Sequence, residues 1–177
     1  MRVHRCFAFV DMCGFTRMND TLGDDEAVEV LAAFRALVRR LAPDHGIRVG
    51  KWFGDGCMFV STETRPIVAG MLDLTRQLES ADIVLPLRTG IAAGPVILFE
   101  GDDFIGMAIN LASRLCDAAG PGEILATAEV AAEVGDEFGF VPLGYRPIPG
   151  IVAPIDVWRI PMSEREGEGD LPFSFVE

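Results

Sequence analysis

The sequence is poor in basic residues and in the residues that bind transition metals. Its 177 residues include 15 Lys and Arg against 27 Asp and Glu, which gives a formal net charge of −12. A surface of this charge repels phosphate backbones and anionic lipids, so we expect neither nucleic-acid binding nor attachment to a membrane. Only two histidines are present and the four cysteines have no CxxC spacing, which argues against a zinc site. A phosphorylated small molecule stays compatible with this composition, because a phosphate site needs only a metal and a few local cations.

Long apolar runs are also missing. The best candidate, residues 91–99, is far too short to span a bilayer. The apolar run near the N-terminus is interrupted at Asp11, so it does not resemble a signal peptide. Four scattered cysteines in a chain without an export signal are expected to be reduced thiols. We therefore expect a cytoplasmic protein.

The chain has the length of one domain with a substantial core, and half of its residues are hydrophobic. Residues 163–177 are acidic at their start and contain glycine, so we expect a flexible tail there and a single domain over residues 1–162.

Hydrophobic periodicity and turn residues predict an α+β fold. The first part of the chain is expected to contain a strand over 6–10, an irregular connection over 16–25 and a helix over 26–41, which Asp24 or Asp25 caps and Pro43 ends. A strand, a hairpin and a second strand are expected over 47–61, and a helix over 66–78. A strand over 85–93 follows, and a tight turn at Gly94-Pro95 is expected to return the chain through 96–99. Beyond these we expect a helix over 107–118, a short strand over 124–126, a small helix through Val130 and a last hairpin between 138 and 158. The order matches a ferredoxin-like βαββαβ core, an antiparallel sheet with helices packed on one face.

Two aspartates follow apolar strand segments. Asp11 ends the segment 7–10, and Asp55 lies at the tip of the hairpin in Gly54-Asp55-Gly56. On its own Asp55 is more often a turn residue than a catalytic one. In the predicted core, however, the first strand and the hairpin lie side by side, so both carboxylates reach one edge of the sheet. Paired carboxylates there can bind a hard cation such as Mg²⁺, which usually carries substrate phosphates.

Four segments in a fixed order make the sequence similar to a known family. They are FVDMCGFT at 9–16, KWFGDG at 51–56, RTGIAAGPV at 88–96 and DFIGMAINLASRL at 103–115. These segments resemble the catalytic domain of class III nucleotide cyclases, the adenylyl and guanylyl cyclases, and the resemblance covers about residues 7–160. Any one segment is weakly specific, whereas four in the right order are strongly so.

The resemblance implies how a metal and a triphosphate are bound. Asp11 and Asp55, with the carbonyl of Met12, correspond to the ligands of two Mg²⁺ or Mn²⁺ ions. In the family these ions activate the ribose 3′-hydroxyl and stabilise the departing pyrophosphate. The backbone N–H groups of Gly14, Phe15 and Thr16 are expected to bind phosphate oxygens near the start of the first long helix.

Four further residues correspond to substrate-binding and catalytic positions. Lys51 and Asp103 are implied to recognise the purine, and this pair favours ATP over GTP. Asn110 is implied to orient the ribose, and Arg114 to stabilise charge on the phosphates. Each has a simpler interpretation: Lys51 flanks a hairpin, Asp103 caps a helix, and Asn110 with Arg114 form a solvated helix face.

The resemblance therefore implies an adenylate cyclase that works as a homodimer, in which Asn110 and Arg114 of one chain complete the site of the other. Two alternatives stay open: a cyclase-like module that binds nucleotide or a partner without turnover, and a guanylate cyclase. Two departures from the family pattern bear on them. The connection before Asp103 is short and acidic, and Pro149 precedes Gly150 where many relatives carry a lysine.

Overall fold

The structure is a computed structural model that describes residues 1–80, 85–101 and 103–162. The tail predicted at 163–177 lies outside the described residues. The strands are β1 (Arg2–Met12), β2 (Arg48–Phe53), β3 (Gly56–Ser61), β4 (Leu87–Phe99), β5 (Asp103–Ile105), β6 (Ile124–Thr127), β7 (Val141–Arg146) and β8 (Ile155–Ile160). The helices are α1 (Phe15–Leu22), α2 (Asp24–Asp44), α3 (Thr64–Ser80), α4 (Met107–Ala118) and α5 (Ala128–Val134), followed by a 3₁₀ turn at Gly135–Phe138.

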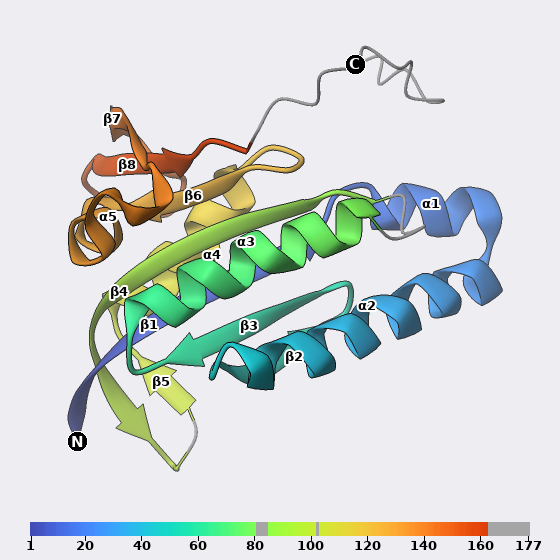
Figure 1. The fold of residues 1–177 in the computed structure, drawn as a ribbon, viewed down its shortest axis with the longest axis horizontal. Helices are drawn as coiled ribbons and strands as arrows, with labels where there is room; N and C mark the ends of the chain where they lie inside the picture. The colour runs from blue at the N-terminus through green and yellow to red at the C-terminus, as the bar shows by residue number, and fades with distance from the viewer. Residues whose placement is uncertain (81–84, 102, 163–177) are drawn as a thin grey trace.

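All eight strands form one sheet in the order β2-β3-β1-β4-β6-β8-β7, with β5 paired to β4 (Figure 1). The segment β2-β3-β1-β4 is antiparallel, and with the helices between its strands it forms the ferredoxin-like core. The parallel pairing of β4 with β6 extends this core toward β8 and β7. The predicted fold class is confirmed. Within the described part of the chain, no helix is long and apolar enough to cross a membrane.

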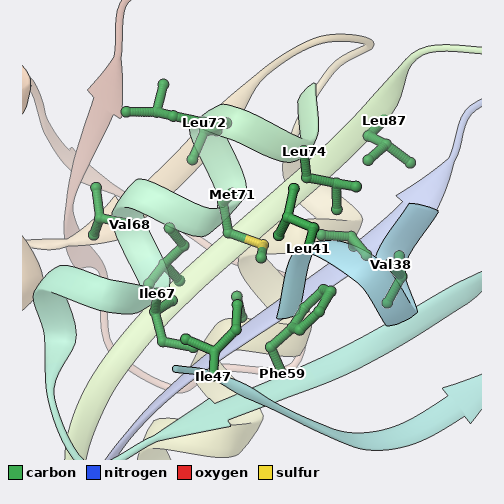
Figure 2. Packing of buried hydrophobic residues seen from close by; sticks show 14 of the residues in the cluster. Val38, Leu41, Ile47, Phe59, Ile67, Val68, Met71, Leu72, Leu74 and Leu87 are labelled. Carbon is green, nitrogen blue, oxygen red and sulfur yellow. The ribbon is translucent and has the colours of Figure 1, made fainter. Parts of the chain in front are cut away.

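The main core lies between the sheet and helices α2 and α3. Alternate residues of β1, namely Cys6, Ala8, Val10 and Met12, point to this side because side chains alternate along a strand. They meet the apolar faces of both helices, and Figure 2 shows Val38 and Leu41 of α2 packed near Met71 and Leu74 of α3.

Helix α4 covers part of the opposite face, where Ala108 and Ala112 pack on Phe7 and Ala92 (Figure 1). The contact is so close that a Cβ on Gly90 of β4 would collide with the α4 backbone at Ala112 and Cys116. The two helices of the predicted core, α2 and α3, share one face as expected, whereas α4, which follows the core in the chain, packs on the other. The rest of this face, over β1 and the β2–β3 hairpin, carries the candidate site.

The predicted irregular connection over 16–25 is wrong, because Phe15–Leu22 form helix α1. Its apolar residues Phe15, Met18 and Leu22 recur at helical spacing, but they are few and none of the helix residues is buried, so the signal in this short segment is weak. The predicted caps of the long helix are also wrong. Gly23 occupies the N-cap position of α2, and Asp24 and Asp25 lie inside its first turn. The positive end of the helix dipole stabilises their negative charge there. Pro43 lies in the last turn, and the helix ends one residue later.

The predicted turn at Gly94-Pro95 is wrong too, since β4 runs without interruption from Leu87 to Phe99. It pairs with β1 along its length, from Arg2 opposite Ile97 to Met12 opposite Leu87. The other edge of β4 pairs with β6 at 89–91 and with β5 at 97–99, and Pro95 falls between these stretches. A proline, which has no N–H to donate, is tolerated where a strand edge needs no partner.

Candidate active site

The sheet register brings Asp11 and Asp55 to the same end of neighbouring strands. Asp11 of β1 lies opposite Gly56 of β3, the residue that follows Asp55. The Met12 N–H donates to the carbonyl of Asp55 at 3.4 Å. Gly56 has to lack a side chain here, because a Cβ would collide with the Val10 carbonyl and lie 3.1 Å from the Asp11 Oδ1. The structure confirms the prediction that the first strand and the hairpin lie side by side in the sheet.

The two carboxylates influence each other electrostatically. Burial raises the pKa of Asp55, and the negative charge of Asp11 raises it further. Among the described residues, no three His, Cys, Asp or Glu side chains form a metal-binding group. Two carboxylates and the Met12 carbonyl are hard oxygen donors, which suit Mg²⁺ or Mn²⁺ and leave coordination positions for substrate phosphates. The donor set therefore fits the implied metal ions.

Arg88 of β4 is a part of this site to which the sequence assigned no role. Its Nε and Nη2 donate to Oδ2 of Asp11 at 2.9 and 2.6 Å, and its Nη1 donates to the Asp117 carbonyl at 3.3 Å. Side chains of Asp11 and Arg88 are 28% and 32% exposed, so this ion pair is only partly screened by water. The antiparallel pairing of β1 with β4 places Arg88 opposite Asp11, and this register is the feature from which the role of Arg88 could have been inferred.

A small cavity of about 230 Å³ opens beside this pair. Asp11, Gly56 and Arg88 line it together with Phe9 and Phe53, whose rings stack at 5.7 Å between centroids. Phe53 is exposed, so the stacked pair forms an apolar wall that reaches the surface.

The predicted phosphate-binding segment directly follows Asp11 in the chain. Gly14 has φ +82°, a conformation that favours glycine, and it precedes the first residue of α1. Phe15 and Thr16 open that helix. The N–H groups of a first helical turn have no partner within the helix, so these amides are available to an anion.

The structure brings Lys51 and Asp103 together although they are far apart in the sequence. Lys51 lies on β2 and Asp103 begins β5, and the Lys51 Nζ is 4.0 Å from the Asp103 Oδ1. Both side chains are exposed, and such an ion pair adds little to stability. The two groups are thus free to turn toward a ligand.

Asn110 and Arg114 lie one turn apart on α4 and line a different, larger cavity. This cavity, of about 460 Å³, extends to the loop that contains Gly150. The Arg114 Nη1 donates to Oδ2 of Asp117 at 3.3 Å. Ser113 is shared by both cavities. Apart from the Lys51–Asp103 pair, the predicted residues therefore form two groups within one chain, one around Asp11 and one around Arg114, and Ser113 and Asp117 lie between these groups.

Comparison with known proteins gives relatives along most of this chain, although no family model matches it. An uncharacterised protein of Mycobacterium tuberculosis is 31% identical over 166 residues, which are 93% of this chain and 43% of the relative. A protein named pH-sensitive adenylate cyclase, also from M. tuberculosis, is 29% identical over 86% of this chain and 39% of its own. The adenylate cyclase of Streptomyces coelicolor is 31% identical over 71% of this chain and 33% of its own. The chain thus spans about two fifths or less of the length of these relatives.

Solved structures share the fold over nearly the whole chain. The adenylyl cyclase CyaB from P. aeruginosa has a TM-score of 0.83 at 24% identity, and the match covers 93% of this chain and 97% of that one. The guanylate cyclase domain of RhGC from Catenaria anguillulae, solved in complex with GTP, has a TM-score of 0.82 at 17% identity over 91% and 98% of the two chains. The guanylyl cyclase Cya2 has a TM-score of 0.79 at 20% identity over 90% and 92%. At these identities the likeness establishes the fold.

Proposed function

Because this chain has the fold of class III adenylyl and guanylyl cyclase catalytic domains, as its sequence predicted, we propose that residues 1–162 form an adenylate cyclase domain. It converts ATP into 3′,5′-cyclic AMP and pyrophosphate. The 3′-hydroxyl oxygen bonds to the α-phosphorus, the bond from that phosphorus to the pyrophosphate oxygen breaks, and the hydroxyl proton passes to solvent. The observation that carries the proposal is the β1–β3 register, which sets Asp11 beside Asp55 in this fold.

Asp11, Asp55 and the Met12 carbonyl would hold two Mg²⁺ or Mn²⁺ ions. When bound, such ions acidify the attacking hydroxyl and neutralise phosphate charge. Arg88 orients the Asp11 carboxylate through two hydrogen bonds to one oxygen. The free amides of Gly14, Phe15 and Thr16 follow the metal-binding end of β1 and bind phosphate oxygens.

Substrate choice rests on Lys51 and Asp103. A carboxylate accepts a hydrogen bond from the adenine amino group, and an ammonium group donates one to a ring nitrogen. Guanine presents a carbonyl oxygen where adenine has its amino group, so Asp103 would face an acceptor. The 4.0 Å separation of the two side chains supports their action on one base.

The site is completed by a second copy of the chain. Asn110 and Arg114 line one cavity and Asp11 lines another, which supports a C₂ homodimer in which Arg114 of each protomer acts on the nucleotide bound at Asp11 of its partner. Two equivalent shared sites result. Arg114 stabilises the charge that develops on the phosphates, and Asn110 orients the ribose.

The test is formation of cyclic AMP from ATP with excess Mn²⁺ over a range of protein concentrations. Product should rise faster than linearly with protein, as for a dissociating dimer, and Asp11→Asn should abolish it while the circular dichroism spectrum stays unchanged. Faster formation of cyclic GMP and pyrophosphate from GTP would instead identify a guanylate cyclase. Nucleotide binding without product, at concentrations where the protein is dimeric, would show a binding module without turnover and overturn the proposal.

A further inference from the structure

A tight turn after β7 lies against the side chain of Arg114. In Ile148-Pro149-Gly150-Ile151 the Ile151 N–H donates to the Ile148 carbonyl at 3.0 Å, and Gly150 has φ +84°. Proline at the second position and a glycine with positive φ at the third define a type II β-turn. Ile148 is buried in a cluster with Leu115 of α4, which anchors the turn to the same helix that carries Arg114.

Gly150 is where the turn touches the arginine. A Cβ added to Gly150 would lie 3.1 Å from the Arg114 Nε, 3.5 Å from Cζ and 3.7 Å from Cδ. The guanidinium group therefore lies over the bare glycine backbone. The Arg114 Nη1 donates to the Asp117 carboxylate at 3.3 Å. Gly150, Arg114 and Asn110 line the same cavity of about 460 Å³.

We propose that the type II turn at 148–151 positions the Arg114 guanidinium for catalysis, with Gly150 as the contact surface and Asp117 as the polar partner. This inference rests on the proposed function, because it assigns a task to the same site. Arginine has a long, flexible stem, so holding its planar head in one place reduces the ordering required in the reaction. Pro149 fixes its own φ and keeps the turn formed.

The chain contains a matched control turn. In Gly120-Pro121-Gly122-Glu123 the Glu123 N–H donates to the Gly120 carbonyl at 3.0 Å, and Gly122 has φ +74°. This turn has the same residue pattern and the same backbone conformation. No described atom lies within 4 Å of the position that a Cβ on Gly122 would take, outside its chain neighbours. Substitution of Gly122 therefore imposes the backbone strain alone.

The experiment compares Gly150→Ala with Gly122→Ala. Both should lower the Tm by similar amounts, since both place a Cβ at positive φ. Only Gly150→Ala also displaces the half-exposed arginine, by a few tenths of an ångström, and rates are sensitive to the placement of catalytic groups. We expect kcat to fall severalfold with KM within about twofold, because the arginine acts mainly on the transition state. Gly122→Ala should keep both constants.

A second readout does not depend on turnover. The Nε–H resonance of Arg114, assigned through its loss in Arg114→Lys, should shift in Gly150→Ala and stay in place in Gly122→Ala. Should the alanine variants fold poorly, Gly150→Asn and Gly122→Asn repeat the comparison, because asparagine tolerates positive φ. Equal kcat values for the two positions with an unmoved resonance would overturn the inference. A wild type without cyclase activity would refute the proposed function, while the resonance would still decide whether the turn holds Arg114.

Discussion

The two groups of the candidate site are built in different ways. The group around Asp11 lies at the ends of paired strands, where Arg88 holds the Asp11 carboxylate by bonds of 2.6 and 2.9 Å. The group around Arg114 lies on one helix, and Arg114 is 51% exposed with its carboxylate partner at 3.3 Å. Sheet register fixes the first group, whereas the second depends on a helix face and the turn at Gly150. We therefore expect loss of the Arg88 side chain to affect stability and activity together, and loss of the Arg114 side chain to affect activity alone.

Asp55→Asn should have the largest effect on turnover. Loss of one metal-binding carboxylate removes several kcal/mol of charge stabilisation, which corresponds to about a thousandfold or more in kcat. Stability should not fall, because burial and Asp11 both raise the pKa of Asp55 and so disfavour its charged form in the folded protein. The measurement is kcat together with the Tm in metal-free buffer at neutral pH. A clearly lower Tm would show that the carboxylate is needed for the fold.

Arg114→Ala should lower kcat by about a hundredfold to a thousandfold, the usual loss for one donor that stabilises transition-state charge. The Tm should stay close to that of the wild type, since the side chain is half exposed and its ion pair is screened. Steady-state kinetics and thermal unfolding of the same preparation test both statements. A fall of several degrees in Tm would remove the contrast between the two groups.

Arg88→Gln should affect both quantities. The Asp11 carboxylate loses a charged partner in a partly buried place, which lowers the free energy of unfolding by about 1 kcal/mol. The kcat should fall as well, because Asp11 is no longer held in one orientation. Urea unfolding and steady-state kinetics measure these effects. Unchanged stability would show that the sheet alone holds Asp11.

Asp73→Asn provides the smallest effect and a reference outside both groups. The Asp73 Oδ2 lies 2.9 Å from the His45 Nε2, and this hydrogen bond lowers the pKa of Asp73, with a further contribution from Gln77. A lowered carboxyl pKa contributes stability that is present above the unfolded-state value and is lost as pH falls through the folded-state value. The wild type should therefore be slightly more stable than the variant near neutral pH, by less than about 1 kcal/mol, with no difference in strong acid. The kcat should be unchanged, and a changed kcat would show that the site is sensitive to distant charges.

Local patterns were sufficient for much of the fold. The helix at Met107–Ala118 was predicted at its observed bounds, and the four-strand core followed from the order of elements. Errors arose where partners distant in the sequence decide the structure. Pro95 looked like a turn, but pairing along the whole of β1 keeps it in a strand. Arg88 was not assigned a role because its partner Asp11 is a cross-strand neighbour, which only the register reveals.

The contact of Gly150 with Arg114 could not be predicted for a similar reason. The sequence shows a Pro-Gly turn at 149–150 and another at 121–122, and nothing local distinguishes them. Tertiary packing places the first against Arg114 and leaves the second open. The contact at this glycine is therefore a property of the folded chain.

The central claim is that the two groups act on one nucleotide only when they come from two chains. Asp55→Asn and Arg114→Ala chains, each inactive alone, are mixed in equal amounts and allowed to exchange subunits, and cyclic AMP formation is then measured. Half of the random dimers carry both variants, and each of these has one intact site of two, so activity should recover to about a quarter of the wild-type value. Absence of recovery, when native mass spectrometry confirms mixed dimers, would contradict a site shared between two protomers.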